Sequence, residues 1–153
     1  MHGGKLFSCA PFKFSEEVKQ AKIDRKSHNE LLSVNATVCG NWEKYGIHMI
    51  DSVLEIIEER PLSVEKRRVG DNSLRLIQLS KGANLTIQTH KNIQPIFNIN
   101  FFFQNGYLPV NITDNFSAFK NVISLFNNMI EKGEAPFDPE ETVRSINTLI
   151  EGY

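Results

Sequence analysis

Apolar and polar residues alternate along two neighbouring segments of the chain, residues 84–90 and 95–103. Alternation sends successive side chains to opposite faces of a strand. Leu85 and Ile87 therefore share one face of the first segment. The matching face of the second segment holds Phe97, Ile99, Phe101 and Phe103. A short polar connection joins the segments, so the pattern predicts a hairpin with one apolar side and one side of neutral amides and hydroxyls.

Residues 32–39 repeat this division between apolar and neutral polar faces. Their apolar side holds Leu32, Val34, Ala36 and Val38, and their polar side holds Ser33, Asn35, Thr37 and Cys39. Residues 63–80 predict two further strands, joined at a turn made by Gly70, Asp71 and Asn72.

Helical spacing of apolar residues predicts helices over residues 45–61, 113–133 and 138–150. Pro61 stops the first, Thr113 or Asp114 caps the second, and Gly133 ends it. Asp138 and Pro139 open the third. A shorter helix, capped by Ser15, is expected near the N-terminus. Two apolar stripes are expected to be buried: Phe116, Phe119, Val122, Ile123, Phe126, Met129 and Ile130 on one helix, and Val143, Ile146, Leu149 and Ile150 on the next.

This order of elements predicts an α/β (α+β) fold, a two-layer sandwich in which helices cover one face of a mixed or antiparallel sheet. Residues 1–31 are expected to be an N-terminal extension, and residues 32–153 a single domain. The amide-rich face would be the open face of the sheet. A polar sheet face commonly pairs with another subunit, so we expect a homo-oligomer with its site near the interface.

Composition narrows the classes of partner. The 153 residues are 41% hydrophobic and 23% charged, with a formal net charge of −1 and a pI near 6.4. This balance gives no reason to expect a nucleic acid or an anionic membrane as partner. No secretion signal is evident, so a cytoplasmic protein is expected. Cys9 and Cys39 lie far apart, which favours reduced structural thiols over a metal site.

The stretch from Gly82 to Thr89, with the strand that follows it, resembles the prokaryotic S-adenosylmethionine decarboxylases. In that family a Glu-Ser-His-Leu-Thr-Ile-His-Thr motif lies at this place, and Leu85, Thr86, Ile87 and Thr89 match it. The resemblance covers roughly residues 32 to 130. It implies a related fold and a pocket for S-adenosylmethionine or a close relative.

Three departures from that family remove its chemistry. The family's serine becomes the pyruvoyl group that decarboxylation requires, and Ala83 stands at that position. Its processing histidine corresponds to Gln88, and its catalytic cysteine falls at about Phe103. A pyruvoyl decarboxylase is therefore not expected.

A dry pocket of neutral hydrogen-bonding groups favours a different reaction of the same ligand. If the carboxylate of S-adenosylmethionine attacks its own γ-carbon, methylthioadenosine leaves and homoserine lactone forms, without any cofactor. We therefore hypothesise a lyase that acts on S-adenosylmethionine or a nucleotide-extended derivative; S-adenosylmethionine lyases are similar in chemistry and architecture. The alternatives are a non-catalytic module that binds S-adenosylmethionine or a nucleotide, and an inactive decarboxylase-like subunit that regulates a partner enzyme.

The candidate residues follow from the polar faces of the strands. Gln88 and His90 are catalytic candidates. The substrate-binding candidates are Asn35, Thr37, Asn84, Thr86, Asn98 and Asn100. Lys66, Arg67 and Arg68 are candidates for holding a phosphate, with a solvated strand end as the alternative. His48 and Asp51 are spaced as a base and its orienting group, but the sequence shows no nucleophile to go with them.

Overall fold

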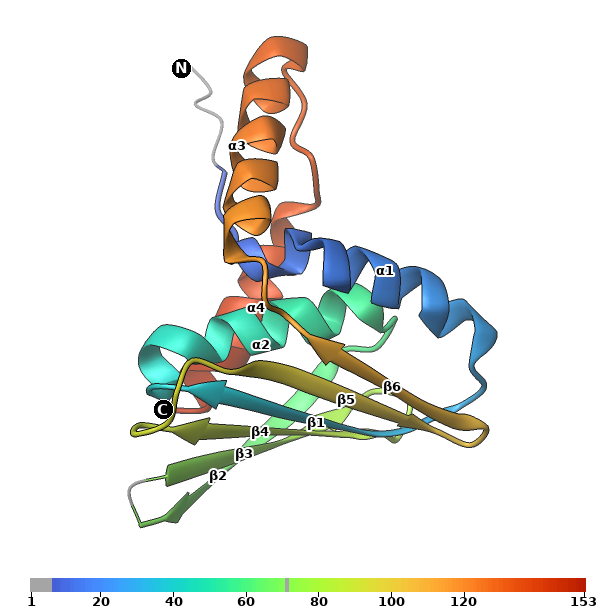
Figure 1. Cartoon of the computed structure of the whole chain (residues 1–153), viewed down its shortest axis with the longest axis vertical. Helices are drawn as coiled ribbons and strands as arrows, with labels where there is room; N and C mark the ends of the chain where they lie inside the picture. The colour runs from blue at the N-terminus through green and yellow to red at the C-terminus, as the bar shows by residue number, and fades with distance from the viewer. Residues whose placement is uncertain (1–6, 71) are drawn as a thin grey trace.

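The structure is a computed structural model that describes residues 7–70 and 72–153, without the side chain of Val69. Six strands form one sheet: β1 (Leu31–Cys39), β2 (Pro61–Val69), β3 (Asn72–Leu79), β4 (Asn84–His90), β5 (Phe97–Phe103) and β6 (Gly106–Asn111). The helices of the described residues are η1 (Pro11–Phe14), α1 (Glu16–Asp24), η2 (Arg25–Ser27), α2 (Trp42–Ile56), α3 (Asn115–Lys132) and α4 (Pro139–Glu151). The α-helices all lie on one side of the sheet (Figure 1), so the expected two-layer α/β sandwich is confirmed.

The sheet is mixed, with the strand order β2-β3-β4-β1-β5-β6. β1 runs parallel to β4, and the other pairs are antiparallel. Because β1 lies between β4 and β5, the predicted hairpin of residues 84–90 and 95–103 is wrong. Their connection crosses the end of β1 instead. Two hydrogen bonds fix this crossing: Gly40 N donates to His90 O at 2.7 Å, and Cys39 N donates to Ile96 O at 3.1 Å.

The edge strand β6 was not expected from the sequence. Pro109 interrupts its pattern, and proline is tolerated in strands mainly at a sheet edge, which is where β6 pairs with β5 alone. A register shift between Leu31 and Ser33 turns Leu31 into the core and leaves Leu32 50% exposed, so the expected burial of Leu32 is wrong.

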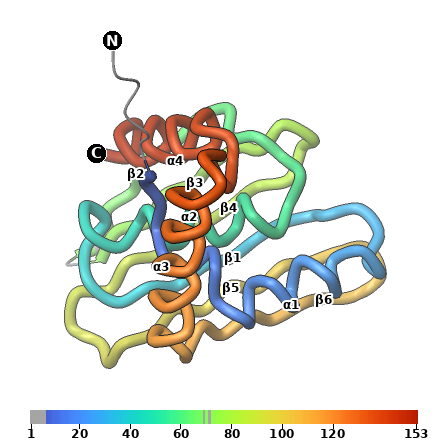
Figure 2. Tube along the Cα trace, turned by 90° about the horizontal axis from the view of Figure 1, so that it is seen from above, coloured from blue at the N-terminus to red at the C-terminus, as the bar shows by residue number. Residues whose placement is uncertain are grey.

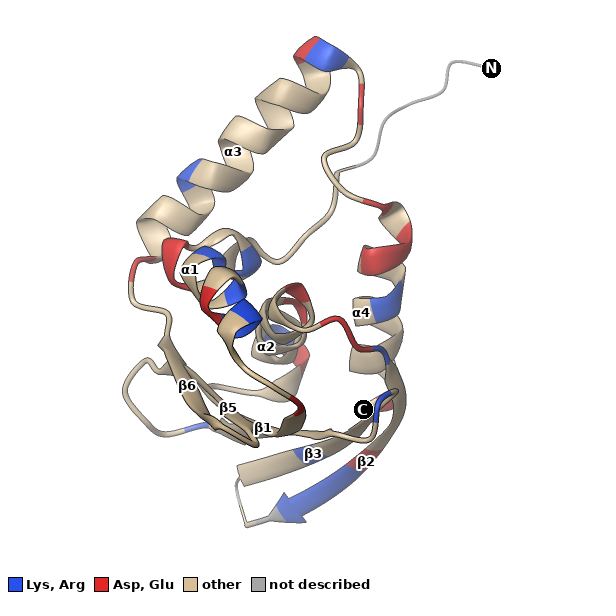
Figure 3. Ribbon diagram, turned by 90° about the vertical axis from the view of Figure 1, so that its right-hand side faces the viewer, with Lys and Arg blue, Asp and Glu red and all other residues tan. Residues whose placement is uncertain are grey.

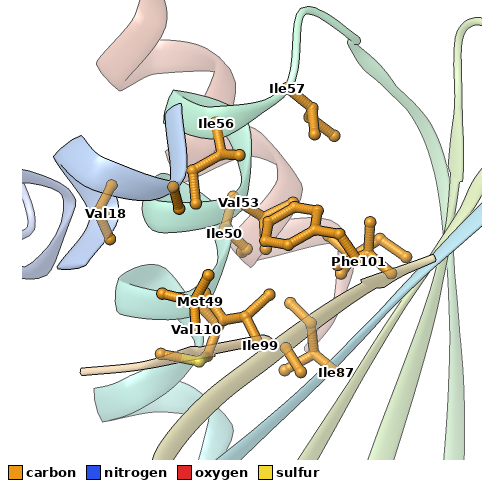
Figure 4. Close-up of a cluster of buried hydrophobic side chains, with 14 of the residues drawn as sticks. Val18, Met49, Ile50, Val53, Ile56, Ile57, Ile87, Ile99, Phe101 and Val110 are labelled. Carbon is orange, nitrogen blue, oxygen red and sulfur yellow. The ribbon is translucent and has the colours of Figure 1, made fainter. Parts of the chain in front are cut away.

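The core lies between the sheet and α2, the central helix. Val34, Ile87, Ile99 and Phe101 rise from the sheet and meet Met49, Ile50 and Val53 of α2; Figure 4 shows much of this cluster. Seen from above (Figure 2), α1 flanks α2 on the side of β6 and α4 flanks it on the other.

The N-terminal segment contributes to this core through Phe12, Val18 and Ala21. A domain boundary after residue 31 stays a prediction. Residues 1–6 of the predicted extension, and Asp71 of the predicted turn, lie outside the described residues.

Helix boundaries follow the signals in the sequence. The side chains of Ser15, Asp114 and Asp138 accept a backbone hydrogen bond at the start of α1, α3 and α4 respectively. Gly133 ends α3 with a φ of 75°, in the left-handed region that favours glycine. These predicted caps and the stop at Gly133 are confirmed.

Candidate functional site

The open face of the sheet carries the candidate substrate ligands in rows across neighbouring strands. Gln88, Thr37 and Asn98 form one row, because Thr37 pairs with both of the others; Thr86, Asn35 and Asn100 form the next. Asn98 and Asn100 use their amides on each other and on Asn111, with N···O distances of 2.5 and 2.7 Å. The amides of these two residues therefore already satisfy part of their hydrogen-bonding capacity within the sheet.

These side chains form no enclosed cavity within the chain. Asn35, Asn84 and Gln88 are exposed, and Thr37, Thr86, His90, Asn98 and Asn100 are half-buried. No described helix covers this face, and none of these eight residues lines any of three cavities found among the described residues. The dry pocket that the lyase hypothesis needs is absent from the described residues. Their assignment as small-molecule ligands, and that of Gln88 and His90 as catalytic groups, stays a prediction.

The run Lys66-Arg67-Arg68 is divided by the alternation of β2. Across the β2–β3 ladder, Lys66 pairs with Arg75, and Arg68 pairs with Ser73. These side chains leave the sheet on the same face as the buried Ile77. Arg67 leaves the opposite face and forms an ion pair with Glu65 at 2.5 Å. Figure 3 shows the positive charge gathered at this end of β2. Lys66 and Arg68 therefore belong to one site and Arg67 does not.

Arg75 lies at the centre of this basic region, and the sequence analysis missed it. Its guanidinium lies over the Trp42 ring at 4.7 Å, and its Nε donates to Gly152 O at 2.5 Å. Only 2% of Arg75 is exposed, and this burial lowers the pKa of its guanidinium. A charged residue at an inward position of β3, between Ser73 and Ile77, is the signal that marks it in the sequence.

His48 lies in the first half of α2, against an aromatic wall. Its ring is 4.5 Å from the Phe12 ring and 6.1 Å from the Tyr45 ring. The buried Nδ1 has no hydrogen-bond partner among the described residues. Burial lowers the pKa of His48, so the imidazole is neutral at neutral pH. Buried polar atoms of proteins normally have a hydrogen-bond partner, and an ordered water or a bound molecule can fill that role at Nδ1.

Asp51 does not orient His48. Its carboxylate accepts from Ala10 N at 3.1 Å and from the Ser145 side chain. Burial raises its pKa, and these hydrogen bonds and nearby Lys13 oppose part of that shift. Asp51 and Lys13 both line a cavity of about 730 Å³ between α1, α2 and α4. Its walls carry both signs of charge, and several pair with one another, such as Lys22 with Glu55 at 2.5 Å.

The apolar faces of α3 and α4 point outward. On α3 the exposed residues are Phe116, Phe119, Ile123, Phe126 and Ile130, and on α4 they are Val143, Ile146 and Ile150. The burial expected for these two stripes is wrong, although Met129 is buried and Leu149 partly so. The small polar residues Ser145 and Thr148 form the buried side of α4 instead. α3 stands away from the sheet (Figure 1). Among the described residues Phe7 contacts Phe126, with 5.8 Å between the ring centroids, and the stripe as a whole stays exposed.

Within the described residues no group of His, Cys, Asp or Glu side chains is arranged to hold a metal ion. No helix of the described part is long and apolar enough to cross a membrane.

A dinucleotide site needs a glycine-rich turn, G-x-G-x-x-G, between a strand and a helix, usually in a parallel sheet. The two direct strand-to-helix junctions of the described chain are β1–α2 and β6–α3, and neither carries this turn. Gly40 at the first junction has a φ of 86°, but a Cβ there would lie 2.4 Å from the Tyr45 ring. That glycine makes room for Tyr45 rather than for a pyrophosphate. The described residues therefore do not fit a dinucleotide of this kind.

The fold of this chain occurs in known oxidoreductases. No family model matches the sequence, and no curated protein matches it. Among solved structures, the myo-inositol dehydrogenase of Lactobacillus casei, a complex with NAD(H) and myo-inositol, superimposes with a TM-score of 0.82 at 13% identity, over 98% of this chain and 59% of that one.

Two further dehydrogenases share the fold. The D-galactose-1-dehydrogenase of Rhizobium etli has a TM-score of 0.74 at 13% identity, over 98% of this chain and 60% of that one. The UDP-N-acetylglucosamine 3-dehydrogenase of Acidithiobacillus ferrooxidans has a TM-score of 0.71 at 13% identity, over 96% and 60%. The chain thus spans about three fifths of the length of these structures. At 13% sequence identity, the structural similarity to these dehydrogenases establishes the shared fold alone.

These structures correct the resemblance drawn from residues 82–89. The three structures above are dehydrogenases and not S-adenosylmethionine decarboxylases, so the decarboxylase resemblance and the lyase hypothesis built on it are wrong. Leu85, Thr86, Ile87 and Thr89 matched because any half-buried strand alternates in this way. In the structure these residues belong to β4, paired with β1 and β3 rather than with β5.

Proposed function

We propose that this chain is the sheet domain of a dehydrogenase-type oxidoreductase that acts on a hydroxyl-bearing small molecule, with the dinucleotide held by a separate domain. Support for the class comes from the dehydrogenase structures that share the fold. Their named substrates, myo-inositol, D-galactose and UDP-N-acetylglucosamine, all carry several hydroxyl groups. The separate domain can belong to the same protein or to a partner chain.

The observation that carries the proposal is the outward apolar face of α3. Phe116, Phe119, Ile123, Phe126 and Ile130 follow each other at intervals of three, four, three and four residues. That spacing makes one continuous seam along a helix, of the kind that packs against another element. The seam residues are 42% to 80% exposed, which is costly unless a partner covers them.

The missing glycine-rich turn supports a dinucleotide-binding domain as the occupant of this seam. The structures of this fold are longer than the aligned region, and the first of them binds NAD(H). The described chain has no turn that fits a dinucleotide. A dinucleotide-binding domain seated on α3 and α4 would cover the apolar faces and supply the missing site at once.

His48 is our candidate for the proton chemistry of the sheet domain. Oxidation of an alcohol requires a group that accepts the hydroxyl proton, and a neutral imidazole can do so. Burial lowers the pKa of His48 and so favours the neutral imidazole, its Nδ1 has no hydrogen-bond partner among the described residues, and it lies in the first half of α2. Tyr45 and Phe12 would hold its ring in place.

The proposal is tested on the native assembly. A tagged chain is purified from its own cells, and native mass spectrometry with cofactor extraction measures the bound NAD(H) or NADP(H). We expect one dinucleotide per assembly, held by a domain other than the described residues. Replacement of Phe119 and Ile123 by Gln should release the dinucleotide-binding domain, whereas Lys120→Gln, on the same helix, should not.

An assembly without dinucleotide would contradict the proposal, as would full retention of the dinucleotide by the Phe119→Gln, Ile123→Gln variant. His48 is tested separately in the active assembly. His48→Asn should lower kcat for alcohol oxidation by about a hundredfold or more and remove the acidic limb of the pH profile, where protonation of His48 stops it from accepting a proton.

A further inference from the structure

A cavity of about 330 Å³ opens at the edge of the sheet where β1, β2 and β4 end. The cavity lies on the face of the sheet that the helices cover, and His48 is not part of its lining. Its lining includes four cationic residues from three different segments: Lys66, Arg68, Arg75 and Lys91. Glu43 is the acidic residue in its lining. The volume is at the lower end of the range for small-molecule sites, about 300 to 1,000 Å³.

The register of the strands brings these cations together. Lys66 lies directly opposite Arg75, and Arg68 lies opposite Ser73, on the same face of the β2–β3 ladder. Ser73 in turn pairs with Thr89 of β4, and Lys91 follows two residues later. Within the described part of the chain, none of the four cations forms an ion pair. Glu43 is a counter-charge in the lining and acts on Arg75, but four cations exceed one carboxylate, and this excess of positive charge favours the binding of an anion.

Neutral donors surround the same space. The hydroxyls of Ser73 and Thr89 are 2.7 Å apart, and both residues line the cavity. The 15-residue helix α2 begins here, with Asn41, Trp42 and Glu43 in the lining. Asn41 caps the helix by accepting from Lys44 N, while the N–H groups of Trp42 and Glu43 form no hydrogen bond with the described residues. The positive end of a helix with free N–H groups suits a phosphate.

The back wall of the cavity is rigid. Trp42 is clamped between two glycines, since a Cβ at Gly46 or Gly152 would lie 2.7 or 2.5 Å from its ring. Arg75 stacks over that ring and donates to Gly152 O, and Lys66 donates to Tyr153 O. Arg75 Nη1 also donates to Leu74 O at 3.5 Å, so these bonds use two donors of Arg75 and one of Lys66, and leave the others for a ligand. Arg68 and Lys91 have no such structural bond within the described residues.

We propose that this cavity binds the phosphate of a phosphorylated small molecule. Arg68 and Lys91 supply the mobile charges and Arg75 the fixed one. The Thr89 hydroxyl donates to Ser73 O, so the neutral donors come from the Ser73 hydroxyl and the start of α2. The guanidinium groups suit the oxygens of a phosphate, and several donors of fixed geometry favour it over chloride. This inference does not depend on the proposed function, because it uses none of His48, α3 or a dinucleotide-binding domain.

The chain provides its own matched control. Arg67 neighbours Arg68 on β2 and carries the same charge, but it leaves the opposite face. Replacing Arg67 or Arg68 by Gln therefore changes the net charge equally, and only the second change alters the cavity. Lys66 and Arg75 are left intact because they also hold the end of α4.

Binding is measured on the full chain by isothermal titration and by amide chemical shifts, with inorganic phosphate, phenyl phosphate and pyrophosphate at constant ionic strength. We expect saturable binding that shifts the amides of residues 41–43, 73 and 89–91. The Arg68→Gln, Lys91→Gln variant should bind at least about tenfold more weakly, or about 1.4 kcal/mol. Arg67→Gln should change the affinity by less than about twofold, since exposed charges far from the ligand are screened.

The three probes identify the kind of phosphate: preference for phenyl phosphate indicates a monoester, and preference for pyrophosphate indicates a diphosphate. Absence of saturable binding by all three would overturn the proposal. Equal weakening by Arg67→Gln and Arg68→Gln would also overturn it, because the attraction would then be a general surface effect. Thermal unfolding of each variant verifies that the fold is retained.

Discussion

At the scale of single residues, chemistry that the sequence hides inside apolar patterns becomes visible in the structure. Asp51 lies within the apolar face of α2, next to the fully buried Ile50 and Val53, yet it is 6% exposed and bound to Ala10 N and Ser145. Arg75 is hidden in β3 in the same way. A periodic pattern shows which face is buried, but it does not show which polar groups find partners there.

Gly46 gives a sharp prediction, because helix propensity and packing act in opposite directions. Alanine is favoured over glycine in a helix by about 1 kcal/mol. A Cβ at residue 46, however, would lie 2.7 Å from the Trp42 ring and 3.0 Å from Leu149. We expect Gly46→Ala to lower the free energy of unfolding by about 1 to 3 kcal/mol, measured by urea denaturation. Ser124→Ala, at an exposed position of α3, should be neutral or stabilising; a stabilising Gly46→Ala would contradict the packing.

The raised pKa of Asp51 predicts a pH dependence. Its carboxyl holds its proton more strongly in the folded chain than in the unfolded one, so its contribution to stability is complete below roughly pH 4 and is lost as the pH rises through the folded pKa. Asp51→Asn does not titrate and keeps an oxygen for Ala10 N. Its stability relative to the natural chain should therefore increase between acidic and neutral pH, measured by denaturation at each pH. A difference that stays constant or shrinks would refute this origin of the shift.

At the scale of elements, helix and strand boundaries are local, whereas their orientation and pairing are not. Ser15, Asp114, Asp138 and Gly133 mark helix ends because capping involves only the next few residues. The apolar stripe of α3 was equally evident, yet it faces outward. Likewise, β4 and β5 both alternate as expected, yet each pairs with β1. Alternation fixes the faces of a strand, not its neighbours.

Two substitutions on α3 separate its outward face from its inward one. Ile123 is 61% exposed and Met129 is 3% exposed. We expect Ile123→Gln to change the stability of the isolated chain by no more than about 0.5 kcal/mol and to reduce its aggregation. Met129→Gln should cost about 2 kcal/mol or more, because it removes a buried apolar side chain and buries an amide. If the two substitutions lowered the free energy of unfolding by similar amounts, the stripe would have to be packed within the isolated chain.

At the scale of the whole molecule, the sheet has one covered face and one open face. The open face joins neutral amides to an apolar corner, where the exposed Phe102 and Tyr107 stack at 6.4 Å. This combination of satisfied polar groups and aromatic rings resembles the composition of protein interfaces. The expected homo-oligomer stays a prediction, and this face is where we expect it to form.

The oligomer is tested by light scattering coupled to size exclusion, in the Ile123→Gln background so that α3 does not mask the result. We expect a dimer or larger oligomer that becomes a monomer when Phe102 and Tyr107 are both replaced by Lys, because buried charge opposes an interface of about 800 Å² per partner. Arg67→Gln on the same face, away from these rings, serves as the control. A monomer in the background variant would disprove the expectation.

The sequence by itself determined the two-layer class, the caps of α1, α3 and α4, and the division of β1, β4 and β5 into an apolar and a neutral polar face. These features depend on residues close together in the chain, so periodicity and capping chemistry suffice to predict them. Tertiary structure alone decided that β1 separates β4 from β5, that the apolar faces of α3 and α4 point outward, and that Lys66 and Arg68 meet Arg75 while Arg67 does not. Those outcomes depend on contacts between residues distant in the chain, whose free energies appear only once the whole sheet is assembled.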